Sequence, residues 1–112
     1  MTGLDIYKKA AFLTGDSLSD SQIGDEAVFA VNEIGKDLCD FEEIEKIGDT
    51  VKASKAVTDV MPYGVAMIYT MLRGETARNE FFCNVYSGKR AALKGTVTQV
   101  TDKLPVASGD AV

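Results

Sequence analysis

The sequence of 112 residues contains no histidine, no tryptophan, two prolines and two cysteines. Without histidine the chain lacks the usual general base of enzymes near neutral pH and the commonest metal ligand. The cysteines, Cys39 and Cys83, are far apart, and no apolar export signal is recognisable before them. We therefore expect two reduced, partly buried thiols and no disulfide between them, because small secreted disulfide scaffolds carry denser cysteine patterns.

Long apolar runs and an excess of positive charge are missing as well. The most apolar stretch, 64–72, is far shorter than the ~18 residues that a membrane-spanning helix requires. Lysine and arginine number 12 against 17 aspartates and glutamates, for a net charge of −5. Nonspecific binding along a nucleic-acid backbone depends on many cationic contacts, which this balance opposes. We expect a soluble, intracellular protein without membrane contact.

Apolar residues recur at helical spacing in the first forty positions. The spacing predicts a helix over 4–13, capped by Thr2 and ended by Gly15. A second helix is predicted over 20–39, with Asn32 on its polar side.

The segment 59–72 is apolar on all sides, which predicts a helix buried at the centre of the core. Asp59 is its expected N-cap, since Pro62 then falls in the first turn. A last helix is predicted from Thr76 to Lys94, ended by Gly95, and the short link between the two predicts an antiparallel helical hairpin. Met67 and Phe82 are expected in its core.

Two segments lack this period. In 40–58, Ile44, Ile47 and Val51 either pin the loop across the bundle or contact another subunit. After Gly95 a β-branched run predicts an extended arm. Its apolar residues are too few for a second core and are interpreted as contacts to a partner: Val97, Val100 and Leu104. The fold class predicted is all-α, a bundle of three to four helices over 1–94, with an extended arm and tip over 95–112.

The sequence contains few residues in patterns that indicate catalysis or cofactor binding. The acidic clusters lack the alternating ligand spacing of a calcium loop, so they are interpreted as solvated faces. No catalytic residue, cofactor or metal is predicted, and the chain is not expected to be an enzyme. Lys89, Arg90 and Lys94 form a basic concentration near the aromatic Tyr86. We interpret them as a favourable helix C-terminus, with contact to a nucleic-acid phosphate or an acidic partner as the alternative.

Several stretches of the C-terminal half carry a resemblance: MPYGVAM at 61–67, RGE at 73–75, NEFF at 79–82 and YSGKRA at 86–91. With them the chain resembles small all-helical head-tail connector, or head-completion, proteins encoded among the head and tail genes of phages and prophages of Gram-positive bacteria. No residue of the four stretches is chemically diagnostic.

The resemblance implies a structural protein that forms a homo-oligomeric ring below the portal and joins the capsid to the tail. Its partners would be further copies of the chain and the portal and tail proteins, and DNA would pass without sequence-specific binding. Its place would be the host cytoplasm during assembly and then the virion. Two alternatives stay open from composition: a small cytoplasmic regulatory or adaptor protein, and a dimeric helical enzyme that uses carboxylates at its interface.

Overall fold

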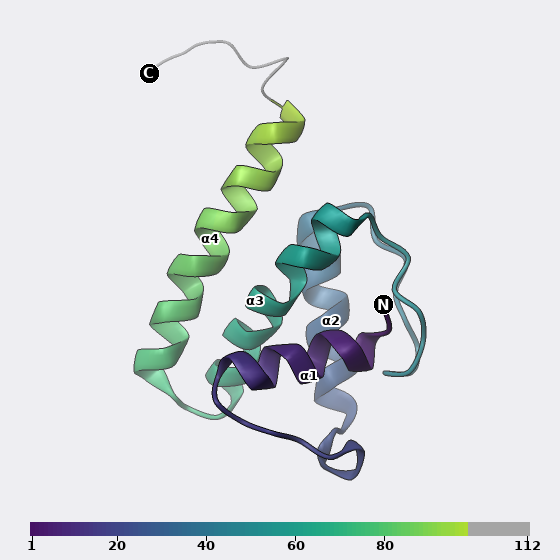
Figure 1. Cartoon of the computed structure of the whole chain (residues 1–112), viewed down its shortest axis with the longest axis vertical. Helices are drawn as coiled ribbons and strands as arrows, with labels where there is room; N and C mark the ends of the chain where they lie inside the picture. Colours follow the sequence, from purple (N-terminus) through teal and green to yellow (C-terminus); the bar gives the residue numbers. More distant parts are fainter. Residues whose placement is uncertain (99–112) are drawn as a thin grey trace.

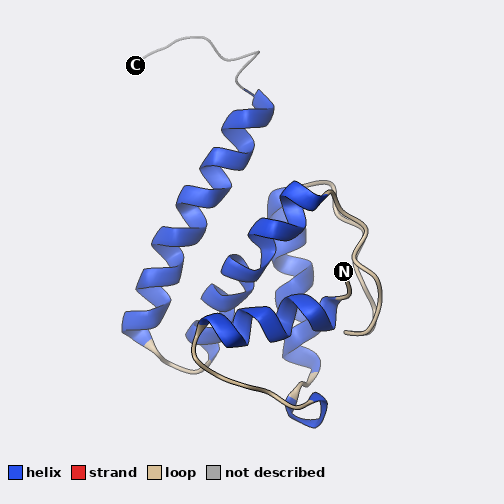
Figure 2. Cartoon of the chain, in the orientation of Figure 1, coloured by secondary structure: helices blue, strands red, loops and turns tan. Residues whose placement is uncertain are grey.

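The computed structural model is an all-α bundle, and it describes the backbone of residues 1–98 and the side chains of residues 1–95 (Figure 1). Helices α3 and α4 form the predicted antiparallel hairpin, α1 crosses α3, and α2 packs on α1 and α3. Within residues 1–98 there are no strands (Figure 2). The predicted all-α class is confirmed. The elements are α1 Gly3–Leu13, the 3-10 helix Asp20–Gln22, α2 Asp25–Leu38, α3 Lys55–Leu72 and α4 Thr76–Thr98.

Helix α3 is the centre of the core, as its apolar sequence predicts. It contacts α1, α2 and α4, and Met61, Val65 and Ala66 are fully buried. Gly64 lies where two neighbours approach most closely: a Cβ there would stand 2.7 Å from Tyr86 and 2.8 Å from Ile34. Glycine at this position lets α4 and α2 both pack directly against the α3 backbone.

Helix α1 begins and ends as predicted. The Thr2 hydroxyl accepts the backbone N–H of Asp5 at 3.1 Å, and the Asp5 carboxylate accepts the Thr2 N–H at 3.0 Å. These bonds form a capping box, and they hold the pKa of Asp5 below its ordinary value. Gly15 follows the helix with a φ of 91°, a conformation that favours glycine.

The second predicted helix is divided, so its expected start at residue 20 is wrong. Asp20–Gln22 forms a separate 3-10 turn, closed by the Gln22 side-chain oxygen accepting the Ser19 N–H at 2.8 Å. The chain is extended at Gly24, and α2 begins at Asp25. Glycine costs about 1 kcal/mol inside a helix relative to alanine, so a break at Gly24 avoids that cost, and the side-chain bonds of Ser19 and Gln22 offer another turn.

Helix α3 begins earlier than predicted, at Lys55, so Asp59 is not its N-cap. The Ser54 hydroxyl caps it by accepting the Val57 N–H at 3.3 Å. Pro62 therefore lies inside the helix and cannot donate to the carbonyl of Thr58. The additional turn buries Val57 and Thr58, and their burial offsets the missing bond.

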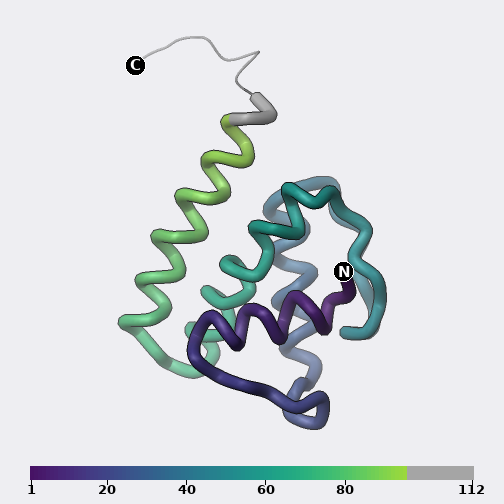
Figure 3. The backbone as a smooth tube through the Cα atoms, viewed as in Figure 1, coloured from purple at the N-terminus to yellow at the C-terminus, as the bar shows by residue number. Residues whose placement is uncertain are grey.

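The loop between α2 and α3 runs from the C-terminal end of α2 past the N-terminal end of α1 (Figure 3). Asn32, predicted on the polar side of its helix, is buried. Its side-chain amide donates to the Ile44 carbonyl and accepts the Ile44 N–H, both at 2.9 Å. The N–H groups of Gly3 and Leu4 donate to the carbonyls of Asp49 and Ile47. The loop is thus an integral part of the bundle.

Helix α4 does not end at Gly95 but continues to Thr98. The prediction of an extended chain is therefore wrong for residues 95–98. A lone extended segment leaves its backbone groups without partners, whereas each further helical residue pairs its N–H within the helix. The remaining arm, including Val100 and Leu104, lies outside the described residues, as does the side chain of Val97.

The hairpin core supplies a matched test, because Phe82 is 4% exposed and the preceding Phe81 is 60% exposed. Phe82→Ala should lower the free energy of unfolding by about 3–5 kcal/mol through lost burial and cavity formation. Phe81→Ala should change it by no more than about 0.5–1 kcal/mol. Urea denaturation measures both; equal midpoints for the two variants would contradict the burial of Phe82.

Two glycines provide a second matched test. Gly64→Ala should destabilise the protein by about 1–3 kcal/mol, because the added methyl group has no space between Tyr86 and Ile34. Gly88→Ala should stabilise it by about 0.5–1 kcal/mol, since Gly88 faces open space within α4 and alanine favours the helix. Thermal unfolding followed by circular dichroism measures both shifts, which are expected to have opposite signs.

Candidate interaction surface

Helices α1 and α3 end in the same hydrogen-bonding pattern. In each, a glycine with positive φ, Gly15 or Gly74, directly follows the capping residue. The next residue's N–H donates back to a carbonyl of the last turn. Asp16 donates to Ala11 at 2.9 Å, and Glu75 donates to Thr70 at 3.0 Å. These are Schellman motifs, which satisfy the last carbonyls of a helix. Each motif also places a carboxylate just beyond its helix end.

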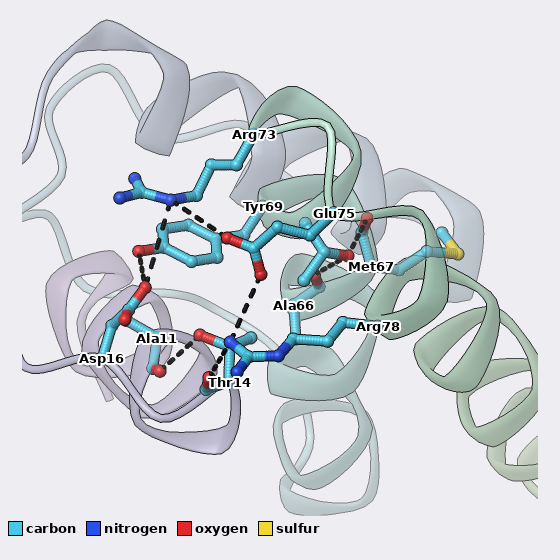
Figure 4. Close-up of polar contacts among 10 residues, drawn as sticks. Ala11, Thr14, Asp16, Ala66, Met67, Tyr69, Arg73, Glu75 and Arg78 are labelled. Carbon is cyan, nitrogen blue, oxygen red and sulfur yellow. Dashed lines mark hydrogen bonds and ion pairs between the residues drawn. The ribbon is translucent and has the colours of Figure 1, made fainter.

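The two carboxylates are joined through residues of α3. The Tyr69 hydroxyl donates to Asp16 at 2.5 Å. The Arg73 guanidinium lies 4.7 Å from the centre of the Tyr69 ring, and its Nε is 3.6 Å from Glu75 and 4.0 Å from Asp16 (Figure 4). Burial and the neighbouring Asp16 carboxylate raise the pKa of Tyr69, so its hydroxyl remains a donor at physiological pH.

Helix α4 is fixed to the same place by its first turn. Arg78 Nη1 donates to the Thr14 carbonyl at 2.7 Å and lies 3.3 Å from Glu75 (Figure 4). The Asn79 side chain donates to the Met67 carbonyl at 2.8 Å. Three helix ends are therefore held together by polar contacts at the turn between α3 and α4.

Around this junction, large apolar side chains point into solvent. Phe12 is 76% exposed, Phe81 60%, Met71 56% and Leu72 53%. They lie on the last turns of α1 and α3 and the second turn of α4. Exposed apolar groups on a rigid support are typical of protein interaction sites. We name these four residues the turn-end surface.

A shallow groove of about 450 Å³ borders this surface. Phe81 forms part of its wall, and its ring packs edge-on against Phe82 with centroids 5.2 Å apart. Both rings line the groove, and their contact supports Phe81 from the side of the core. The lining residues are Leu13, Thr14, Gly15, Ala77, Arg78, Phe81 and Phe82.

A second polar cluster fixes the middle of α4 to α2. Asp37 accepts the Tyr86 hydroxyl at 2.7 Å and the Arg90 Nε at 2.7 Å. Burial opposes ionisation of Asp37, but the hydrogen bonds from Tyr86 and Arg90 outweigh it and hold the pKa of Asp37 below its ordinary value. The pKa of Tyr86 is raised by burial and by Asp37.

The basic residues of α4 do not form its last turn, so their interpretation as a helix C-terminus is wrong. Arg90 binds Asp37, and the Lys89 ammonium lies 4.4 Å from the centre of the Tyr63 ring. Because α4 extends to Thr98, these side chains lie mid-helix and attach it to α2 and α3.

The three predicted partner contacts of the loop lie elsewhere than at the turn-end surface. Ile44 and Val51 are 6% and 4% exposed, and Ile47 is half-buried against the core. Of the two interpretations of their loop, the structure has the one in which it packs across the bundle, so Ile44 and Val51 are not available to a partner.

Phe12 and Phe81 were missed, although the sequence holds a signal for each. Phe12 lies outside the apolar stripe of its helix. Phe81 directly precedes Phe82, and because neighbouring helical side chains point about 100° apart, Phe82 faces the core here while Phe81 faces solvent.

Metal and membrane sites are not found in the part of the chain that the structure describes. No three histidine, cysteine or acidic side chains converge there to hold a metal ion. None of the helices within residues 1–98 has the length and apolarity that a bilayer crossing demands. Both cysteines are free thiols and half-buried, as predicted.

No protein-family model, curated protein or solved structure matches this chain.

The Asp37 cluster predicts a pH-dependent contribution to stability. A carboxyl whose folded-state pKa is depressed stabilises the fold above its unfolded pKa of about 3.9, and the contribution is lost as pH falls through the folded-state value. Asp37→Asn should therefore cost about 1 kcal/mol at pH 7, allowing for its partial exposure, and less as the pH falls below about 4.

Urea unfolding at a series of pH values measures this difference. Asp40→Asn, which removes an exposed carboxylate outside the cluster, is the control and should track the wild type. A wild-type advantage over Asp37→Asn that stays constant into strong acid would contradict the role of the ionised carboxylate.

Proposed function

We propose that this protein is a structural subunit of head-tail connector type, which forms a ring below the portal and joins capsid to tail. It assembles in the host cytoplasm and then becomes part of the virion. The proposal joins the resemblance of the C-terminal half to such proteins with the properties of the turn-end surface. The proposal assigns the protein no catalytic residue.

The observation that carries the proposal is the exposure of Phe12, Phe81, Met71 and Leu72 at one end of the bundle. Leaving these side chains in water is unfavourable, by about 1.5–3 kcal/mol for each large apolar side chain. The polar junction beneath them holds the three helix ends in fixed positions, so little conformational freedom is lost on binding. Such a surface supports a permanent assembly contact.

The net charge of the chain supports a ring through which DNA passes without being bound. A ring that surrounds DNA works better if its wall does not hold phosphates, and the chain has a net charge of −5. Arg90 is paired with Asp37, and Arg73 and Arg78 lie beside Glu75. These cations are therefore matched locally, which favours passage of DNA over binding.

The test is the oligomeric state of the full chain over a wide concentration range, with and without a portal. Native mass spectrometry and negative-stain electron microscopy should show a closed ring of one subunit number, alone or on the portal. Phe12→Ser should lose this assembly while its helical signal and thermal midpoint stay near those of the wild type, since Phe12 is 76% exposed.

Lys9→Ser is the matched control, because Lys9 is also exposed and lies one turn earlier on α1. It should assemble like the wild type. A protein that stays monomeric under all conditions would overturn the proposal. A discrete dimer that does not bind the portal would instead favour the alternative function, a small regulatory or adaptor protein.

A further inference from the structure

The groove beside the turn-end surface has an apolar wall and an exposed cation at its rim. Leu13, Ala77 and Phe81 supply apolar groups, and the Arg78 side chain is 57% exposed although it contacts Thr14 and Glu75. A groove of this composition fits a short peptide with apolar side chains and an acidic residue between them.

The chain contains such a peptide beyond the described residues. Val100, Leu104 and Val106 supply apolar side chains, and Asp102 lies between the first two. At alternate positions all four would share one face of an extended peptide. The contacts of Arg78 to Thr14 and Glu75 both use its Nη1, so Nε and Nη2 are left to receive Asp102 as an anionic counterpart.

This peptide cannot reach the groove of its own chain. Helix α4 runs from the groove to Thr98, and at about 1.5 Å per residue Thr98 lies about 26 Å from Phe81 and about 32 Å from Ala77 along the axis. Leu104 follows Thr98 by six residues, which span at most about 22 Å. The chain would also have to reverse direction, which shortens its reach further.

We infer that residues 100–106 of one copy dock in the groove of the next copy, formed by Leu13, Thr14, Ala77, Arg78 and Phe81. The groove and its occupant lie at opposite ends of one helix, so the contact is head-to-tail. Repeated contacts of this kind close into a ring or continue as an open chain, according to the rotation between copies. The inference rests on the proposed function for closure into a ring, but not for the contact itself.

Two alanines of the full chain give a matched test of the groove. Ala77 and Ala56 are both exposed and both occupy the second position of a helix, but Ala77 lines the groove and Ala56 lies at the far end of the hairpin (Figure 1). Ala77→Asp should weaken self-association about tenfold or more in Kd, and Ala56→Asp should leave it unchanged. Leu104→Asp should match the loss seen with Ala77→Asp.

A disulfide trap tests the contact directly. In a background of Cys39→Ala and Cys83→Ala, isotope-labelled Ala77→Cys chains are mixed with unlabelled Leu104→Cys chains and oxidised. Peptide mass spectrometry should find a disulfide between positions 77 and 104 of different chains. The same mixture with Ala56→Cys in place of Ala77→Cys should give none.

The outcomes separate the two proposals. Rings that persist in Ala77→Asp and Leu104→Asp, without the trapped disulfide, would overturn the docking of residues 100–106 and leave the connector proposal standing. Open chains held by a disulfide between positions 77 and 104 would support the docking and contradict the closed ring. A wild type without any self-association, and without the trap, would overturn both.

Discussion

The whole bundle depends on close packing around α3 at Gly64. A helix that is apolar on all sides must be covered on all sides, and here α1, α2 and α4 do so together. Gly64 lets Tyr86 and Ile34 approach the α3 backbone more closely than any side chain would allow. Ile34 lies on α2 and Tyr86 on α4, so this contact also sets where Asp37 of α2 meets Tyr86 and Arg90 of α4.

The turn-end surface follows from two helix terminations. Each Schellman motif needs its glycine, and each delivers one carboxylate to the same junction. Tyr69, Arg73 and Arg78 connect these carboxylates to the helices around them. Because the polar groups satisfy one another, the apolar side chains around them are left for contacts outside the subunit. The position of the turn-end surface is therefore set by the backbone geometry of the two helix ends, and its apolar side chains lie around that position.

Elements with an unbroken local signal could be predicted from the sequence. The capping of α1 by Thr2, the left-handed conformation of Gly15 and the burial of α3 were all predicted. Positions where a tertiary contact outweighs a local preference could not. Asn32 looks polar on a helical wheel, but the loop brings the Ile44 backbone to it, and two hydrogen bonds make its burial favourable.

The same conflict explains the boundaries that were wrong. Pro62 favours a late start for α3, yet burial of Val57 and Thr58 outweighs one missing backbone bond. Gly95 and the β-branched residues after it favour an end to α4, yet each further helical residue pairs its backbone N–H within the helix. A tertiary contact also explains why the apolar residues of the loop pack on the bundle and not on a partner. Loop residues such as Ile44 are apolar because they are buried in the bundle itself. An apolar loop residue therefore indicates a partner only where the subunit's own core does not already bury it.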